Sequence, residues 1–240
     1  MKNRINFNKL NIIAVIAGNK PLLLSGQAKK NKADIIELRI DTFKNLNPDF
    51  LCKTIITIKR DTQLPIIGTF RSFIEGGKCP ISEEKRLEIF KSIIPYVDVV
   101  DIELSADKII DEVIEFARKQ HKKIIISYHN FKKTPNEREL NKILSLSIKK
   151  SPDITKIATF ASTLDDVLRL FLFNHKFSHE NRLITSMCMG KFAAVSRLLG
   201  PVFGSKLIYG YIGTAIVSGQ LSVKSVFSLL NTIYRSNSRI

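Results

Sequence analysis

Tryptophan is absent from this sequence of 240 residues, cysteine is rare, and no long apolar run occurs. The three cysteines, Cys52, Cys79 and Cys188, form an odd set without a Cys-x-x-Cys spacing. Such a set argues against a disulfide framework and against a structural zinc site. We therefore expect a reducing compartment, the cytoplasm. Because no apolar run reaches the ~18 residues needed to cross a bilayer, we expect no membrane partner.

Acidic residues are the scarcer charge, since 22 Asp and Glu stand against 38 Lys and Arg, which gives a net charge of +16. A surface this basic could bind nucleic acid or an anionic membrane. The lysines instead occur in short pairs along the whole chain, such as Lys29-Lys30 and Lys149-Lys150, where helices and loops should meet solvent. This spacing favours a solvated lysine-rich surface and no nucleic-acid partner, although the positive field would attract a small anionic substrate.

Glycine and proline are too scattered for a collagen-like or low-complexity chain, with 11 Gly and 8 Pro in no fixed period. Hydrophobic residues make up 44% and charged residues 25%, the composition of a globular protein with enough apolar surface to offset chain entropy. At the N-terminus, Lys2 and Arg4 precede the apolar run 12–17 in the order of an export signal. The run is short and asparagines interrupt the approach to it, which favours a buried strand.

Short runs rich in Ile and Val recur along the chain, with amphipathic stretches between them. Near-continuous apolar runs of this length are typical of strands covered on both faces. Ser82 and Thr163 each precede acidic residues, a pattern that predicts the start of a helix. The predicted strands are Asn11–Ala17, Ala33–Ile40, Pro65–Arg71, Val97–Leu104, Lys123–His129, Ile154–Phe160, Leu183–Met189 and Lys206–Gly210.

Strict alternation of strand and helix implies a parallel sheet. Eight such units, with no Gly-x-Gly-x-x-Gly after the first strand, favour a (β/α)8 TIM barrel over an open dinucleotide-binding sheet. An α/β barrel commonly uses ~250 residues as one domain. We therefore predict an α/β fold with a single barrel domain over residues 1–240.

Catalytic side chains of such a barrel lie at the C-terminal ends of its strands. The second predicted strand ends with Glu37, Arg39 and Asp41 on one face, because side chains alternate along a strand. Glu37 and Arg39 could bind a ligand or form a structural salt bridge with each other. Arg71 ends the third predicted strand, and it would be costly to hold close to Arg197 unless an anion binds between them.

Lys156 is the most informative single residue, because it lies in the middle of a predicted strand. An ammonium group there cannot reach bulk water easily, so desolvation should favour the neutral amine. A neutral amine is the nucleophile that condenses with a ketone to form an imine. The alternative is a lysine that bonds a buried carboxylate, or one on the surface if the strand register is wrong.

His129 ends the strand before that of Lys156, at the depth where a general acid/base would face the amine. It could instead be a core histidine with satisfied hydrogen bonds. A metal site is disfavoured, because His129 has no partner at ligand spacing.

Taken together, these segments resemble the type I 3-dehydroquinate dehydratase family, the imine-forming enzymes of the shikimate pathway. The likeness runs through the whole predicted barrel, from residue 37 to residue 220. No single segment is specific, but their order and their position at strand ends are. The segments are Glu37-Leu38-Arg39-Ile40-Asp41, Thr69-Phe70-Arg71 with Glu75-Gly76-Gly77, His129-Asn130-Phe131 with Thr134-Pro135, Asp153-Ile154-Thr155-Lys156-Ile157-Ala158, Met187-Cys188-Met189-Gly190, Ser196-Arg197-Leu198 and Val202-Phe203-Gly204-Ser205.

The resemblance implies dehydration of 3-dehydroquinate to 3-dehydroshikimate with neither a metal nor an organic cofactor. Lys156 would attack the ketone and form the imine, and His129 would move the protons. Arg197 would hold the substrate carboxylate. The resemblance also implies a homodimer. In the remaining roles, ring hydroxyls would be bound by Glu37, Arg39 and Arg71, the lid contact would come from Gln220, and the pocket wall from Phe131, Met187 and Met189.

One departure from the family pattern lies after the last predicted strand. The family usually carries Ser-Ala-Pro-Gly-Gln there, as a lid whose Ser and Gln contact the substrate. This chain has Ile216-Val217-Ser218-Gly219-Gln220, so one hydroxyl contact is lost or supplied elsewhere. We expect a higher KM rather than loss of turnover. Tyr209 stands where phenylalanine is frequent.

Two other functions compete with this interpretation. A class I aldolase also uses a strand lysine, but an aldolase that acts on sugar phosphates needs a glycine-rich phosphate nest after the last two strands, which this sequence lacks. A basic barrel that binds nucleic acid without chemistry predicts binding that weakens steeply as salt rises. It also predicts no effect when Lys156 is changed to Ala.

Overall fold

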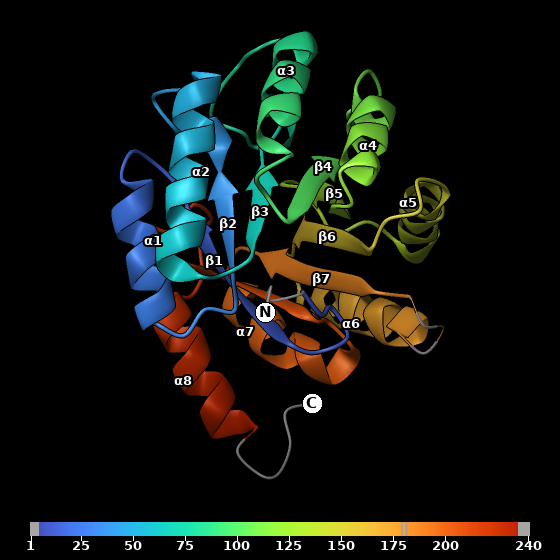
Figure 1. Cartoon of the computed structure of the whole chain (residues 1–240). Coiled ribbons are helices and arrows are strands. Elements are labelled where there is room, and N and C mark those ends of the chain that lie inside the picture. The colour runs from blue at the N-terminus through green and yellow to red at the C-terminus, as the bar shows by residue number, and fades with distance from the viewer. Residues whose placement is uncertain (1–4, 179, 181, 235–240) are drawn as a thin grey trace.

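The computed structural model describes residues 5–178, 180 and 182–234, in which strands and helices alternate along the chain (Figure 1). The basic residues Lys2 and Arg4 lie outside this part. The strands are β1 (Asn11–Ile16), β2 (Ile35–Arg39), β3 (Ile66–Thr69), β4 (Val99–Glu103), β5 (Lys123–Asn130), β6 (Ile154–Phe160), β7 (Ile184–Met189) and β8 (Leu207–Tyr211).

Each strand is followed by a helix that returns the chain to the other end of the sheet. The helices are α1 (Pro21–Lys30), α2 (Pro48–Thr62), α3 (Glu83–Ile93), α4 (Ile110–Lys119), α5 (Glu137–Lys149), α6 (Leu164–Ser178), α7 (Ala193–Leu199) and α8 (Val223–Ile233). Three short 3-10 turns lie in the connections of the described chain: η1 (Ile40–Thr42), η2 (Phe73–Glu75) and η3 (Gly200–Phe203).

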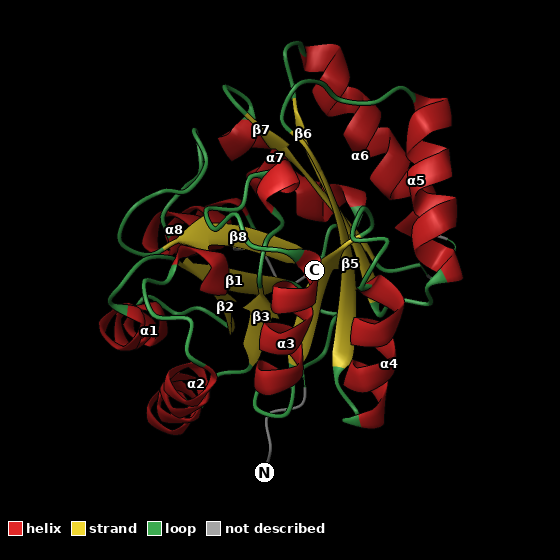
Figure 2. Cartoon of the chain, turned by 90° about the horizontal axis from the view of Figure 1, so that it is seen from above, coloured by secondary structure: helices red, strands yellow, loops and turns green. Residues whose placement is uncertain are grey.

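All paired strands are parallel, in the order β7-β6-β5-β4-β3-β2-β1-β8. The sheet curls into a nearly closed barrel with the helices around it (Figures 1 and 2). Within the described residues, no backbone pairing joins the edge strands β7 and β8. The predicted single-domain (β/α)8 TIM barrel is confirmed.

The strand sequences are near-continuously apolar because the barrel buries both of their faces. Ile12, Ala14 and Ile16 of β1 belong to the larger apolar cluster, which includes helix residues. Ile13 and Val15, which point the opposite way, belong to a second cluster that also contains residues of all seven other strands. This cluster therefore fills the barrel interior. Above it, the interior positions of β2, β4, β5 and β6 become polar. This change marks the level of the site.

Two helices, α3 and α6, begin where the sequence predicted. Ser82 caps α3 by accepting a hydrogen bond from the Lys85 backbone N–H, as predicted. Thr163 likewise accepts from the Asp166 backbone N–H at the start of α6. Strand β2 ends one residue earlier than predicted, because η1 takes up Ile40–Thr42. Asp41 therefore lies in a turn instead of a strand.

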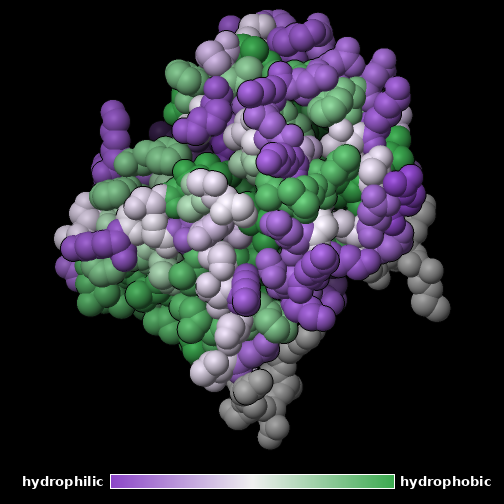
Figure 3. Space-filling model, turned by 90° about the vertical axis from the view of Figure 1, so that its left-hand side faces the viewer, coloured by the Kyte–Doolittle hydropathy of each residue, from purple (hydrophilic) through white to green (hydrophobic). Residues whose placement is uncertain are grey.

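The surface and the cysteines agree with a lysine-rich globular protein. On the face shown in Figure 3, hydrophilic side chains form several separate groups with apolar ones between them. Cys52, Cys79 and Cys188 are free thiols. None of the helices that the structure describes is both long and apolar enough to span a membrane. The cytoplasmic location inferred from the cysteines stays a prediction.

Candidate active site

A cavity of about 290 Å³ lies at the C-terminal ends of the strands. Its walls are charged on the side of β2 to β6 and largely apolar where β1, β7, β8 and the loop after β8 contribute. It brings together every residue that the sequence analysis assigned to the site: Glu37, Arg39, Arg71, His129, Phe131, Lys156, Met187, Met189, Arg197 and Gln220.

Lys156 is buried in the middle of β6, with only 6% of its side chain exposed. Its Nζ donates a hydrogen bond to Oδ2 of Asp101 at 2.9 Å and lies 3.5 Å from Oε1 of Glu37. The ring of Tyr209 covers it, with the ring centroid 4.3 Å from Nζ. The amine is therefore buried, as predicted, and it also contacts a buried carboxylate, the alternative that the sequence left open.

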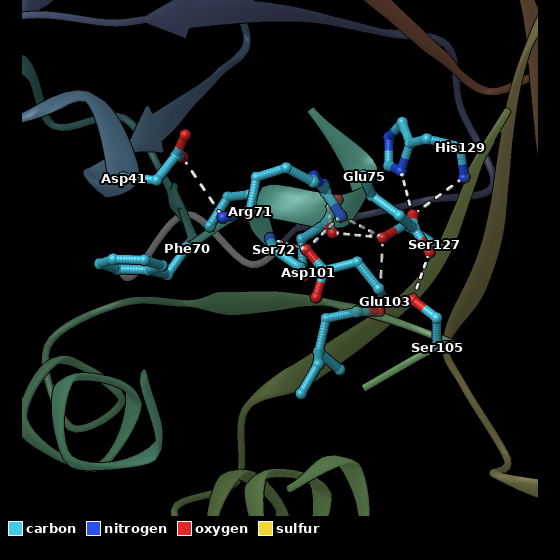
Figure 4. Close-up of polar contacts among 12 residues, drawn as sticks. Asp41, Phe70, Arg71, Ser72, Glu75, Asp101, Glu103, Ser105, Ser127 and His129 are labelled. Atoms are coloured by element: carbon cyan, nitrogen blue, oxygen red, sulfur yellow. Dashed lines mark hydrogen bonds and ion pairs between the residues drawn. The ribbon is translucent and has the colours of Figure 1, made fainter. Parts of the chain in front are cut away.

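His129 lies on the neighbouring strand, closer to the mouth of the barrel. Ser127 of β5 pairs with Lys156, and His129 pairs with Ala158, so the imidazole stands two residues beyond the amine. Oε2 of Glu75 lies 2.9 Å from Nδ1 of His129 and accepts a hydrogen bond from its backbone N–H at 3.0 Å (Figure 4). The hydroxyl of Ser105 donates to the other carboxylate oxygen.

Burial moves the pKa values of this pair in opposite directions. It raises the pKa of Glu75 to about 7, against the influence of Arg71. It also lowers the pKa of His129 well below 6.5, and the positive charges of Arg71 and Lys156 add to this effect. His129 is therefore neutral at physiological pH. When Glu75 is ionised it can only accept, so Nδ1 carries the hydrogen and Nε2 is free to take a proton.

Arg71 is held by carboxylates on both sides (Figure 4). Its Nη2 donates to Asp101 at 2.7 Å, and its Nη1 donates to Glu103 at 2.9 Å and to Ser127 at 2.7 Å. Burial works to lower the pKa of Arg71, but Asp101 and Glu103 outweigh it and raise the pKa. The other oxygen of Glu103 accepts from Arg86, a fully buried arginine of α3, at 2.6 Å.

These contacts form one chain of alternating charges, Arg86–Glu103–Arg71–Asp101–Lys156. Each carboxylate bridges two cations with different oxygen atoms. Burial would raise the pKa of Asp101, but Arg71 and Lys156 outweigh it and lower the pKa, so this carboxylate stays ionised. This series of ion pairs fixes the position of the Lys156 amine relative to α3.

Glu37 and Arg39 do not form the salt bridge that the sequence allowed. Arg39 instead holds Asp41 through two hydrogen bonds, from Nε at 2.8 Å and Nη2 at 2.9 Å. The reason is local, because the η1 turn brings the Asp41 carboxylate back towards Arg39. Glu37 accepts from the Thr69 hydroxyl at 2.8 Å on the neighbouring strand.

Arg197 differs from the other arginines of the cavity because no carboxylate of the described chain pairs with it. It is 5% exposed, and its Nη1 donates to the carbonyl oxygens of Cys188 and Ala193, each at 2.8 Å. Burial lowers its pKa to about 10. A buried guanidinium without an acidic partner can bind a ligand anion, which would supply the missing negative charge.

The apolar wall has a buried part and a rim. Met187 and Met189 are buried, whereas Phe131 is 47% exposed and lies at the mouth, so it does not belong to the dry interior. Ile216 of the loop after β8 packs against the interior cluster. Gln220 lines the same side, and its buried Oε1 has no hydrogen-bond partner among the described residues.

Sequence reasoning missed four polar residues of the site. Asp101 and Glu103 interrupt the apolar β4 in the same way as Lys156 interrupts β6, so the same signal was present. Glu75 belongs to a quoted segment but received no role, because its contact with His129 spans a separation of 54 residues. Ser127 lies within the predicted fifth strand, two residues before His129.

No group of three His, Cys, Asp or Glu side chains suited to a metal ion occurs in the described ranges 5–178, 180 and 182–234. The buried polar groups of the cavity are instead ion-paired or hydrogen-bonded to protein groups, apart from one atom each of Arg197, Tyr209 and Gln220 that has no partner among the described residues.

Fold and cavity together define a (β/α)8-barrel enzyme with a buried lysine, a neutral histidine and a buried arginine that no carboxylate of the described residues pairs with. The model of the family described as "Type I 3-dehydroquinase" matches residues 20–237. The chain belongs to this family of shikimate-pathway lyases.

Several relatives resemble the chain over nearly its full length. The 3-dehydroquinate dehydratase of Methanosarcina acetivorans is 36% identical over 231 residues, which covers 94% of this chain and 95% of the relative. That of Clostridioides difficile is 36% identical over 234 residues, covering 93% and 91%. A crystal structure of the type I enzyme from Clostridium difficile, with covalent modified comenic acid, matches with a TM-score of 0.89 at 31% identity, covering 99% and 100%.

Proposed function

We propose that this chain dehydrates 3-dehydroquinate to 3-dehydroshikimate through an imine on Lys156, with His129 as the general acid/base. The single observation that carries the proposal is one cavity that holds a buried amine, a neutral imidazole and a buried arginine free of carboxylate partners. Membership of the type I 3-dehydroquinase family supports the choice of substrate.

In the first step, the Lys156 ammonium group passes a proton to neutral His129, and the free amine attacks the ketone carbon of the substrate. The new carbon–nitrogen bond yields a carbinolamine. The imidazolium returns the proton to the carbinolamine hydroxyl, which leaves as water and gives the protonated imine. Asp101 holds Nζ at 2.9 Å and thereby fixes the direction of the attack. Because the imine nitrogen is positively charged, it withdraws electrons from the neighbouring carbon and acidifies its proton.

In the second step, Nε2 of His129 removes that proton, and the electron pair moves into the imine as an enamine. The imidazolium then returns a proton to the departing hydroxyl group, which leaves as water. Glu75 supports both transfers, because it holds Nδ1 at 2.9 Å and stabilises the charged ring. Hydrolysis of the product imine restores Lys156.

The substrate is oriented from the other side of the cavity. Arg197 binds the carboxylate, which supplies the anion that its burial lacks. Glu37, Arg39 and Arg71 face the ring hydroxyls. All four side chains are already held by protein partners, Arg197 through two backbone carbonyl oxygens, so they are fixed before the substrate arrives.

Borohydride trapping tests the proposal. Borohydride added with 3-dehydroquinate should reduce the imine and leave a covalent adduct, which mass spectrometry locates on the peptide that carries Lys156. Lys123→Met is a matched control, because Lys123 is also a strand lysine but pairs with Asp153 and is 41% exposed. This variant should keep the adduct. An active preparation with no adduct, or with one elsewhere, would contradict the mechanism.

The role of His129 is separable from that of Lys156. His129→Ala should still form the trapped adduct, more slowly, while losing most of the enone product that follows proton removal. Unchanged turnover in this variant would remove His129 from the mechanism. This variant therefore distinguishes imine formation from proton transfer.

We also propose that the chain forms a homodimer, as the family resemblance implies. A stripe of exposed apolar residues on α6 supports this, since Leu164, Leu168 and Leu172 recur at helical spacing and are 45 to 63% exposed. Light scattering coupled to size exclusion measures the mass in solution. A mass of one chain at micromolar concentration would rule the dimer out.

A further inference from the structure

Tyr209 of β8 carries a hydroxyl that the described protein leaves unused. The residue is 3% exposed, and its hydroxyl oxygen has no hydrogen-bond partner within the described ranges. Burying a hydroxyl without a partner is unfavourable, so such groups are rare in folded proteins unless a water or a ligand satisfies them. The unused hydroxyl therefore points to a missing polar partner.

The position of Tyr209 identifies where that partner would lie. Its side chain lines the active-site cavity, and its ring centroid is 4.3 Å from Nζ of Lys156. Val15, Met187 and Ile216 belong to the same apolar interior cluster and offer no hydrogen bond. Among the described residues that line the cavity, Tyr209 alone bears a hydroxyl.

The phenol is suited to donate. Burial raises its pKa well above 10, and the nearby carboxylates of Glu37 and Asp101 act in the same direction. The hydroxyl therefore keeps its proton at physiological pH. Because the ring of Tyr209 covers the amine, a donor on this side chain matches a substrate oxygen close to the carbon that the amine attacks.

We propose that Tyr209 is a substrate-binding residue whose hydroxyl donates a hydrogen bond to a substrate oxygen beside the carbon attacked by Lys156. This inference rests on the proposed function of the cavity. It also accounts for the apolar Ile216 in the loop after β8, because the hydroxyl group that this loop lacks is supplied from β8 instead.

The test is Tyr209→Phe, which removes the hydroxyl and keeps the ring over Lys156. KM for 3-dehydroquinate should rise about tenfold, the equivalent of about 1.4 kcal/mol, with a smaller effect on kcat. The unfolding temperature without ligand should stay equal or increase, because no protein hydrogen bond is lost. The stabilisation by saturating substrate or product analogue should decrease.

Tyr234→Phe is the matched control, because the Tyr234 hydroxyl lies outside the cavity and donates to the carbonyl oxygen of Leu198 at 2.7 Å. It should show the opposite pattern, a lower unfolding temperature with unchanged KM. If KM of Tyr209→Phe rises less than twofold in an active enzyme, the role of Tyr209 is excluded. A wild-type protein that neither turns over 3-dehydroquinate nor forms the trapped adduct would overturn the proposed function itself.

Discussion

A single carboxylate oxygen of Glu75 meets two nitrogens of His129, the backbone nitrogen at 3.0 Å and Nδ1 at 2.9 Å. The backbone contact fixes where the carboxylate lies, and the ring contact fixes how the imidazole is turned. Since Glu75 comes from the η2 turn after β3, the imidazole on β5 is oriented by a residue two strands away. Its ionisation then decides which ring nitrogen can act.

The pH dependence of activity should report Glu75. Below a pH of about 7 this carboxyl becomes protonated and no longer draws the hydrogen to Nδ1. His129 stays neutral over the same range, so it does not produce this effect itself. We expect kcat/KM to fall about tenfold per unit below pH 7. Glu75→Gln should have a lower kcat/KM that does not change between pH 5.5 and 8. If kcat/KM of this variant still falls below pH 7 as in the wild type, Glu75 is not the titrating group.

The same group should set part of the pH dependence of stability. Burial raises the pKa of Glu75 from 4.5 to about 7, so the folded protein holds a proton that the unfolded chain releases between these values. Its contribution to the free energy of unfolding therefore falls as pH rises through this window, by up to about 3 kcal/mol.

Urea denaturation of Glu75→Gln and wild type, measured from pH 4.5 to 8, checks this prediction. The glutamine side chain of the variant does not titrate. The free energy of unfolding of the variant minus that of the wild type should therefore increase with pH and level off above pH 7. Glu88→Gln on the exposed face of α3 is the control and should show no trend. A constant difference at all pH values would contradict the prediction.

Asp101→Asn should harm both folding and imine formation. The substitution leaves Arg71 and Lys156 buried without the carboxylate that lies between them. Removal of one partner from such a buried pair costs about 3 kcal/mol or more of unfolding free energy. The rate of borohydride trapping should also decrease, because Nζ loses the acceptor that directs it.

The matched control for Asp101→Asn is Asp111→Asn, which breaks an ion pair with Lys150 on the outer surface, where Asp111 is 76% exposed. Surface pairs contribute little, so stability and trapping should both remain unchanged. Equal effects of the two substitutions would show that Asp101 has no special role.

Gly77→Ala should displace the site through the backbone. A Cβ atom on Gly77 would lie 2.1 Å from the carbonyl oxygen of Arg71, a clash that no side-chain movement relieves. We expect kcat/KM to fall more than tenfold together with a loss of stability. Gly26→Ala in α1 is the control, because nothing lies within 4 Å of its Cβ position. It should raise stability by roughly 0.5–1 kcal/mol and leave activity unchanged.

The sequence predicted the barrel well because its strands are buried on both faces. An apolar run such as residues 154–160, in a chain where such runs alternate with amphipathic stretches, favours a covered strand, and the lysine within it is then conspicuous. Lys156 was identified in this way. Asp101 gave the same signal in the middle of β4 and was overlooked, whereas Glu103 ends that strand, where an acidic side chain can also lie in solvent.

The sequence predicted which residues belong to the site better than it predicted which of them contact one another. Which carboxylate meets Lys156, Arg39 or His129 depends on turns such as η1 and η2, and one residue more or less changes the partner. A salt bridge between Arg39 and Glu37 was one of two alternatives that the sequence left open, and Arg39 holds Asp41 instead. The unused hydroxyl of Tyr209 is visible only when every possible partner in space has been checked.

The open edge between β7 and β8 makes one side of the cavity less firmly held than the other. Lys156 and His129 lie on strands that are hydrogen-bonded to a neighbouring strand on both sides. Arg197 and Gln220 lie in the segments that follow β7 and β8, the two strands at this edge. There, Thr185 on β7 donates its side-chain hydroxyl to the Leu207 carbonyl oxygen at 3.0 Å, where a backbone ladder would otherwise run. Backbone amides along β7 and β8 should thus exchange with deuterium sooner than those of β5. The carboxylate end of the ligand would be released by a compliant wall while the covalent end stays rigidly held.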